Sequence, residues 1–203
     1  MRAFGQLTVV VLSAMLGLCG QAMAAEPCNA GSLDSVPGKA WNEAFGWRYD
    51  TSQNPDPQQR DSENLKNRQT AYTQLVTQTP PWPDWFQPPI AILPVGTVFN
   101  MAMSKGQKDD QLGGFGTFDR IDSVSEAREY LAVLKAWKPD IDRVNRYRVT
   151  EVLPVHVGPI GPQVDPDACA LLPGRFSQFE MLVARDQRVH YVQLVGSYPI
   201  AQD

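Results

Sequence analysis

Five prolines lie between Pro80 and Pro89, and they divide the chain into two parts of different character. Proline fixes φ and has no backbone N–H, so this segment can be neither a helix interior nor a central strand. We expect it to be an extended connector whose rings Trp82, Trp85 and Phe86 pack on the body of the protein. The alternative is an exposed ligand for a proline-reading domain.

The residues before this connector show helical spacing. Trp41, Phe45 and Tyr49 recur every four residues, which predicts a short helix packed through one face. Asn54-Pro55-Asp56-Pro57 is expected to interrupt regular structure. Ser62 is a good N-cap for a second helix that runs to about Thr77.

The residues after the connector alternate in the manner of strands, and a capping box at Ser123 and Glu126 predicts one helix that Pro139 ends. The strands expected are 90–93, 96–103, 115–118 and 144–157, the last interrupted by Pro154, and a closing hairpin of 177–184 and 189–196. Residues 158–174 are expected to form a long loop. With helices early and strands late, the sequence predicts a single α+β domain, divided into a helical and Pro/Trp-rich segment, 25–93, and a mixed or antiparallel sheet core, 94–203.

The N-terminus has the three parts of a secretory signal peptide. Arg2 supplies positive charge, Leu7 to Leu18 is apolar, and Ala22-Met23-Ala24 is a small-x-small cleavage site. The apolar run is shorter than the roughly 20 residues that span a bilayer. We therefore expect residues 1–24 to be removed and the mature chain, without a membrane span, to be secreted or periplasmic.

The mature chain keeps two cysteines, Cys28 and Cys169, in a compartment where thiols oxidise. A disulfide between them is the favoured prediction. The alternative is a catalytic Cys169 thiolate, for which only His156 or His190 could serve as the base.

Composition and motifs exclude several functions. The net charge is −4 and no basic block occurs, which argues against a nucleic-acid partner. His156 and His190 stand apart from any metal-ligand spacing, so no metal site is expected. The chain also lacks a Gly-x-Ser-x-Gly elbow and a phosphate-binding loop of the Gly-x-x-x-x-Gly-Lys type.

Gln178 and Glu180 stand out in the strand-like run 177–184. Side chains alternate across a strand, so these two polar groups share one face while Phe179 and Met181 share the other. A Gln-x-Glu on a strand that follows a loop containing Pro173-Gly174 resembles the Q-x-E signature of the ADP-ribosyltransferase superfamily. Three segments follow one another in an order similar to that in the superfamily. They are the strand 96–103, Gly114-Phe115-Gly116-Thr117-Phe118 and Gln178-Phe179-Glu180.

A second resemblance overlaps the first over roughly residues 94–198. Three segments are similar to the C-terminal half of secreted NAD glycohydrolases of the tuberculosis-necrotizing-toxin type. They are Tyr147-Arg148-Val149, Val155-His156-Val157-Gly158-Pro159-Ile160 and Pro173-Gly174-Arg175-Phe176-Ser177-Gln178. Gln178 corresponds to the functional glutamine of that family. Three positions depart from these patterns. Relative to ADP-ribosyltransferases, the first strand has no arginine at the expected place, and the second strand has Thr117 alone where two hydroxyls are usual. In the loop before the glutamine, Arg175 replaces the second glycine of the NAD glycohydrolases.

These resemblances imply a toxin-like enzyme that takes NAD as its substrate. Glu180 would stabilise the ribose cation and Gln178 would orient the attacking water or acceptor, while Thr117 would take part in binding NAD. The basic residues that would neutralise the diphosphate are Lys105, Arg120 and Arg175. A protein acceptor or a cognate inhibitor would be the protein partner.

A different reading stays open. Gln178 and Glu180 could lie on the solvated face of an ordinary amphipathic strand. The chain would then be a non-enzymatic binding or envelope-associated protein that uses the aromatic connector as its contact surface.

Overall fold

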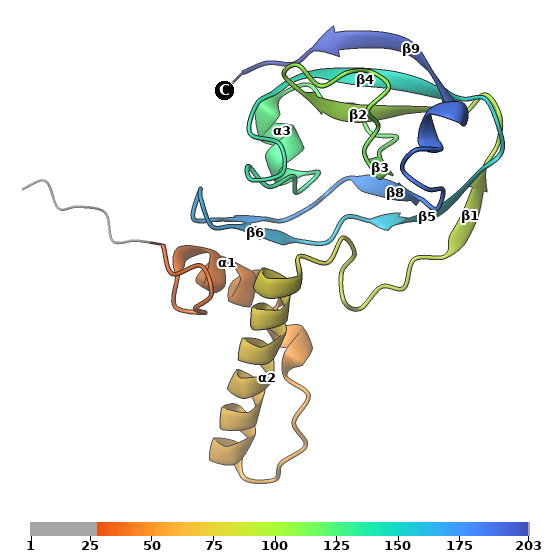
Figure 1. The fold of residues 1–203 in the computed structure, drawn as a ribbon. Coiled ribbons are helices and arrows are strands. Elements are labelled where there is room, and N and C mark those ends of the chain that lie inside the picture. The colour runs from red at the N-terminus through yellow and green to blue at the C-terminus, as the bar shows by residue number, and fades with distance from the viewer. Residues whose placement is uncertain (1–27, 203) are drawn as a thin grey trace, which may run out of the picture.

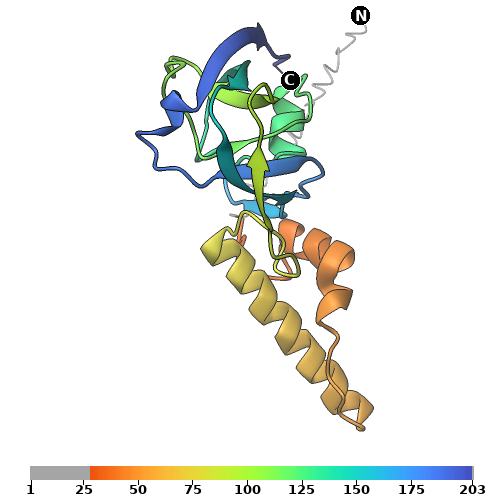
Figure 2. The same cartoon turned by 90° about the vertical axis from the view of Figure 1, so that its right-hand side faces the viewer.

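The computed structural model describes residues 28–202 and has an α+β fold in which two helices precede the strands (Figure 1). The predicted signal peptide therefore lies outside the described residues. The helical elements of the first part are α1 (Val36–Phe45), the 3₁₀ turn η1 (Gly46–Tyr49) and α2 (Pro57–Gln78). Helix α2 projects away from the strand-rich part of the molecule (Figure 2).

The N-cap of helix α2 lies six residues before Ser62, where the sequence predicted it. Asp56 is the N-cap, and its carboxylate accepts a hydrogen bond from the Gln58 backbone N–H at 2.9 Å. Pro57 follows at the first helical position, where a missing N–H costs nothing. The prediction was wrong because the prolines that were taken to interrupt structure instead start the helix.

An aromatic cluster holds these helices together. The Trp41 ring is 2 % exposed and lies 5.3 Å from the ring centroids of both Tyr49 and Tyr72. The Tyr72 hydroxyl donates to the Ala30 carbonyl at 2.6 Å. The predicted four-residue spacing thus marks a buried face, although Tyr49 lies in η1 and not in α1.

The strands form two antiparallel sheets and one small hairpin (Figure 1). The first sheet has the order β1 (Ile90–Leu93), β5 (Leu153–Pro159), β8 (Ser177–Met181) and β3 (Phe115–Gly116), and the second has the order β2 (Val98–Ser104), β4 (Ile141–Val149) and β9 (Val192–Pro199). The hairpin is β6 (Gln163–Asp165) with β7 (Ala170–Leu172), and the remaining elements are α3 (Val124–Glu129) and the 3₁₀ turn η2 (Arg188–His190).

The main core lies between the two sheets. Phe99 of β2 meets Phe179 of β8 edge-on, with ring centroids 5.0 Å apart, and stacks on Tyr147 of β4 at 5.6 Å. All three rings are at most 2 % exposed. The backbones of Asn100 and Thr117 exchange hydrogen bonds of 2.8 and 3.0 Å, which join the edge of β2 to the residue that follows β3. The two sheets are therefore fixed to each other at this point.

The expected closing hairpin does not form. Strand β8 pairs with β5 and β3, whereas β9 pairs with β4 in the other sheet. The residues between them, with η2, cross from one sheet to the other. The prediction failed because a short connection does not require two successive strands to pair with each other.

Three further predictions need correction. Residues 158–174 contain the β6–β7 hairpin, whose turn is stabilised by Asp165 Oδ1 accepting from the Asp167 and Ala168 N–H groups at 3.0 and 3.2 Å. Helix α3 ends at Glu129, well before Pro139, and Ala132 just beyond it has a φ of 50°. The strand expected over 144–157 is two strands, and Pro154 lies inside β5.

The Pro80–Pro89 connector forms neither helix nor strand and packs on the body, as predicted. The Phe86 ring lies so close to Gly158 of β5 that a Cβ at that glycine would come within 2.2 Å of it. Trp85 lies 5.8 Å from the Phe45 ring and keeps 44 % of its surface exposed. Backbone hydrogen bonds from Val157 and Gly161 to carbonyls of the connector complete the contact.

Cys28 and Cys169 form the predicted disulfide across a sequence separation of 141 residues. The bond joins the segment before α1 to the turn of the β6–β7 hairpin. It excludes the alternative of a free Cys169 thiolate in this state. No helix within residues 28–202 combines the length and apolar character that crossing a bilayer requires.

Candidate functional site

A cavity of about 400 Å³ opens between the two sheets on the side of the hairpin and the segment that follows α3. Its wall comes from β2, from the glycine-rich turn into β3, from the connector, from the segment after α3, from β6 with the residues just before it, and from β8. The lining residues are Thr79, Pro81, Asn100–Ala102, Gly113–Thr117, Leu131–Val133, Trp137, Lys138, Ile160, Gly161, Gln163 and Gln178. Most of these residues are apolar, so the few polar groups decide what the cavity can bind.

Gln178 lies on β8 and is 8 % exposed. Its Nε2 donates to the Pro81 carbonyl at 2.6 Å, and the same carbonyl accepts from the Gly161 N–H at 3.1 Å. A carbonyl accepts hydrogen bonds only, so this contact fixes which end of the amide is nitrogen. The Gln178 Oε1 accepts no hydrogen bond from the residues the structure describes, and it is left as an acceptor for a ligand.

Gln163 of β6 makes the same kind of hydrogen bond as Gln178, but to the preceding residue of the connector. Its Nε2 donates to the Pro80 carbonyl at 2.6 Å, and its Oε1 is buried without a partner among the described residues. Gln163 is 2 % exposed. Sequence reasoning missed this residue because it fell in a segment expected to be an irregular loop.

Thr117 lines the cavity beside Gln178 and is 2 % exposed. Its hydroxyl donates to the Ser177 carbonyl at 2.7 Å. Asp119 Oδ2 accepts from the Ser177 N–H at 2.7 Å and from the Ser177 hydroxyl at 2.8 Å. These contacts fix the start of β8 and thereby the position of Gln178. Asp119 was not among the predicted site residues, since its partner is distant in the sequence.

Lys138 is the basic side chain among the lining residues. Its Nζ donates to Gln107 Oε1 at 2.9 Å. Burial lowers the pKa of Lys138, and the nearby charge of Arg143 lowers it further. A cation that is partly desolvated binds an anionic group more strongly than an exposed one does. No sequence pattern marked Lys138, which follows a helix that ends earlier than expected.

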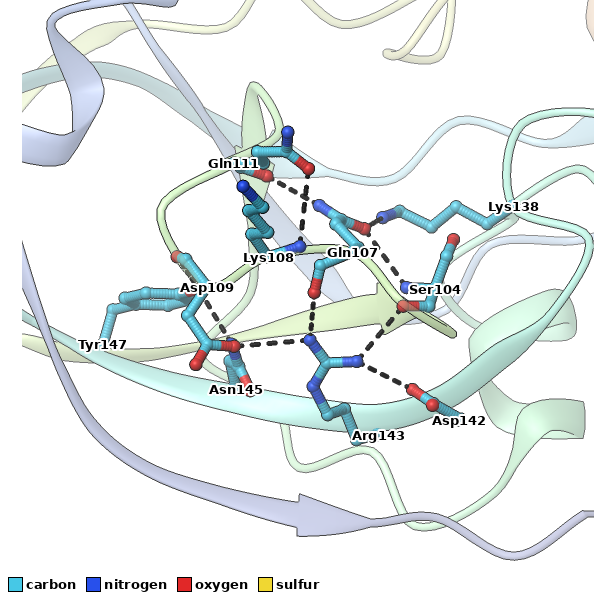
Figure 3. Close-up of polar contacts among 10 residues, drawn as sticks. All are labelled: Ser104, Gln107, Lys108, Asp109, Gln111, Lys138, Asp142, Arg143, Asn145 and Tyr147. Atoms are coloured by element: carbon cyan, nitrogen blue, oxygen red, sulfur yellow. Dashed lines mark hydrogen bonds and ion pairs between the residues drawn. The ribbon is translucent and has the colours of Figure 1, made fainter.

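Strand β4 holds the loop that carries Gln107 and leads to the glycine-rich turn (Figure 3). Arg143 donates to the carbonyls of Ser104 and Gln107 and pairs with the carboxylates of Asp109 and Asp142. Asn145 Nδ2 also donates to Asp109 Oδ1 at 2.8 Å, and the Tyr147 hydroxyl donates to the Asp109 carbonyl at 2.8 Å. Hydrogen bonds from Asn145 and Arg143 lower the pKa of Asp109. The loop over 104–111 is therefore attached to β4 at several points.

The predicted phosphate-binding cations do not line the cavity. Lys105 is exposed, and Arg120 is 74 % exposed at its side chain and pairs with Asp122 at 2.5 Å. Arg175 is exposed and lies over the Tyr130 ring at 5.5 Å. Of the residues predicted to bind the dinucleotide, only Thr117 belongs to the wall.

Glu180 shares the strand face of Gln178, as the alternation predicted, because Phe179 and Met181 are both buried in the core. Its carboxylate lies 3.5 Å from His156 Nδ1 of β5, and both side chains are about one-third exposed. Glu180 is not a lining residue, and neither is any other carboxylate within the described part of the chain. No cluster of His, Cys, Asp or Glu that could hold a metal ion occurs among residues 28–202.

No protein-family model and no curated protein matches the sequence. Among solved structures, the chain is similar to Tne2 in its complex with Tni2, with 23 % identity and a TM-score of 0.49 over 60 % of this chain and 99 % of Tne2. It is also similar to Rhs1-CT in complex with its cognate immunity protein RhsI1, at 16 % identity and a TM-score of 0.38 over 55 % and 80 % of the two chains. The match to Tse6 in complex with Tsi6 has 15 % identity and a TM-score of 0.34 over 77 % and 96 %. At these values the likeness assigns no activity to the chain.

Proposed function

We propose that the protein is an exported, toxin-like NAD glycohydrolase that binds NAD in the cavity between its sheets and cleaves the bond between nicotinamide and ribose. The observation that carries the proposal is the Gln178 amide of the cavity wall, whose nitrogen donates to the Pro81 carbonyl while its oxygen accepts no hydrogen bond from residues 28–202. The resemblance to secreted NAD glycohydrolases assigns its functional glutamine to this same position.

The chemistry assigned to Gln178 is the orientation of water. As the glycosidic C–N bond breaks, its electron pair leaves with neutral nicotinamide and positive charge develops on the ribose. The Gln178 Oε1 accepts a hydrogen bond from the attacking water or from a ribose hydroxyl and holds it near the anomeric carbon. The water oxygen then bonds to that carbon, and its proton passes to solvent.

Two further features of the cavity support the proposal that NAD binds there. A volume of about 400 Å³ lies within the usual range of roughly 300–1,000 Å³ for small-molecule sites. Lys138 places one cation at the wall for the diphosphate, in the role that the sequence gave to Lys105, Arg120 and Arg175.

No carboxylate lines the cavity among the described residues, so the proposed reaction is assigned to Gln178 without a role for Glu180. In the ADP-ribosyltransferase resemblance Glu180 stabilises the ribose cation, yet Glu180 is not a lining residue. An activity that depends on Gln178 and tolerates the loss of the Glu180 charge would fit this arrangement. An activity that is lost with the Glu180 charge would instead fit the role that the ADP-ribosyltransferase resemblance gives to this residue.

The test uses the disulfide-bonded mature protein and follows free nicotinamide and ADP-ribose by chromatography. Gln178→Ala should slow turnover by about 10²-fold or more, as expected when a group that acts in the transition state is lost. Gln193→Ala, on the exposed side of β9, is the matched control and should leave turnover unchanged. Wild-type protein that neither consumes nor binds NAD would refute the proposal.

A non-enzymatic binding protein is the second candidate, and the apolar character of the wall favours it. Met101 of β2 lines the cavity, and β2 lacks the arginine that the resemblance to ADP-ribosyltransferases would place on this strand. NAD binding without any release of nicotinamide would identify this function. The aromatic connector is a poorer contact surface for it, because Phe86 packs against Gly158.

A further inference from the structure

Arg188 carries a positive charge that no other described residue neutralises. It begins the 3₁₀ turn η2, on the segment that crosses from β8 to β9. Within residues 28–202 its side chain forms no ion pair and donates no hydrogen bond. Of its three nitrogens only Nε is buried in this unpaired state, so Nη1 and Nη2 are accessible to a ligand. A bound anion would offset the cost of removing part of this charge from water.

The guanidinium of Arg188 lies against the glycine-rich turn that leads into β3. Its Nη2 and Nη1 atoms are 3.4 and 3.6 Å from the position that a Cβ would take on Gly114. A side chain larger than a methyl group at Gly114 would therefore occupy the space of the guanidinium. Gly113 and Gly114 are also residues of the cavity wall, so this contact lies at the edge of the cavity.

The turn adds backbone donors to the charge. The N–H groups of Gly113 and Gly114 donate to no other group within the described part of the chain. The Gly114 carbonyl accepts from the Met181 N–H at 2.8 Å, which attaches the turn to the end of β8. Backbone N–H groups in a turn, together with the planar fork of an arginine, are donors that bind phosphate groups in proteins.

We propose that Arg188 and the turn at Gly113 and Gly114 form a phosphate-binding site that takes the diphosphate of a dinucleotide. The assignment to the diphosphate of NAD rests on the proposed function. Arg188 can donate two parallel hydrogen bonds to one phosphate group, whereas Lys138 on the cavity wall acts as a point charge. Arg188 thus supplies the bidentate contact, and Lys138 supplies a second charge.

The experiment measures the dissociation constant of inorganic pyrophosphate by calorimetry on the disulfide-bonded mature protein. Arg188→Gln should weaken binding by about 10-fold or more, as expected for lost hydrogen bonds to a charged group. Arg188→Lys keeps the charge without the fork and should restore only part of the affinity. Arg185→Gln removes the same charge from an exposed position of the same segment, and it should change the constant by less than about 2-fold at about 0.15 M salt.

A second measurement needs no variant at residue 188. In wild-type protein labelled with ¹⁵N-glycine, pyrophosphate should shift the amide signals of Gly113 and Gly114 and leave that of Gly196 in β9 unchanged. If Arg188→Gln does not fold, as judged by its melting curve, this titration decides. Wild-type protein that binds no pyrophosphate, or binding that leaves both turn signals in place, would overturn the proposal.

Equal losses in Arg185→Gln and Arg188→Gln would also overturn it, because the attraction would then be a general effect of charge. NAD hydrolysis is measured separately. Hydrolysis with a KM that Arg188→Gln leaves unchanged refutes this site alone. Pyrophosphate binding that depends on Arg188, in a protein that releases no nicotinamide, refutes the proposed function alone.

Discussion

Replacing Gly116 by alanine tests how tightly the two sheets are packed beside the cavity. A Cβ at this position of β3 would lie 2.5 and 2.9 Å from two atoms of the Phe179 ring and 2.8 Å from the Phe99 ring. Both rings are at most 1 % exposed and meet edge-on at 5.0 Å, so neither can turn away without displacing the core. Overpacking of this kind costs about 1–3 kcal/mol.

The cost can be measured by urea denaturation with a matched control. Gly→Ala at an unstrained site stabilises by about 0.4–1 kcal/mol because it lowers the entropy of the unfolded chain. Gly196 of β9 has no heavy atom within 4 Å of its Cβ position, so Gly196→Ala should show that gain alone. For a domain of this size each kcal/mol shifts the melting temperature by about 2–4 °C.

The double variant Gly116→Ala/Phe179→Leu should lose less stability than the sum of the two single variants, because the smaller side chain makes room for the methyl group. Additive losses would point to a cause other than the predicted clash. If Gly116→Ala were as stable as Gly196→Ala, the close packing of the sheets at β3 would be refuted.

Three further predictions concern stability. Reduction of Cys28–Cys169, which closes a loop of 141 residues, should lower the unfolding free energy by about 4–5 kcal/mol in the chain-entropy model, and an unchanged urea midpoint with reductant would contradict this. Asp119→Ala removes the acceptor of two hydrogen bonds from Ser177 and should cost about 1.5–3 kcal/mol, whereas Asp119→Asn, which keeps an acceptor oxygen, should cost less by the same assay. Phe86→Ala should cost about 1–2 kcal/mol of apolar burial, and an unchanged melting temperature would mean that the connector does not stabilise the fold.

The sequence by itself determined the features that depend on near neighbours along the chain. The four-residue spacing at Trp41 located the buried face of the first helix, and the cap at Ser123 located the start of α3. The alternation around Phe179 placed Gln178 and Glu180 on one face of a strand. Each of these signals is set by contacts within a few residues, which is the range that periodicity and capping describe.

Only the tertiary structure decided which strands pair and which side chains meet at the cavity. Strands β8 and β9 follow each other closely in the chain but join different sheets, because cross-strand packing chooses partners irrespective of sequence distance. The bond from Gln178 to the Pro81 carbonyl spans 97 residues, and the bond from Gln163 to the Pro80 carbonyl spans 83. No local pattern encodes contacts over such separations, so the lysine and the two glutamines of the cavity wall could be identified only in the folded chain.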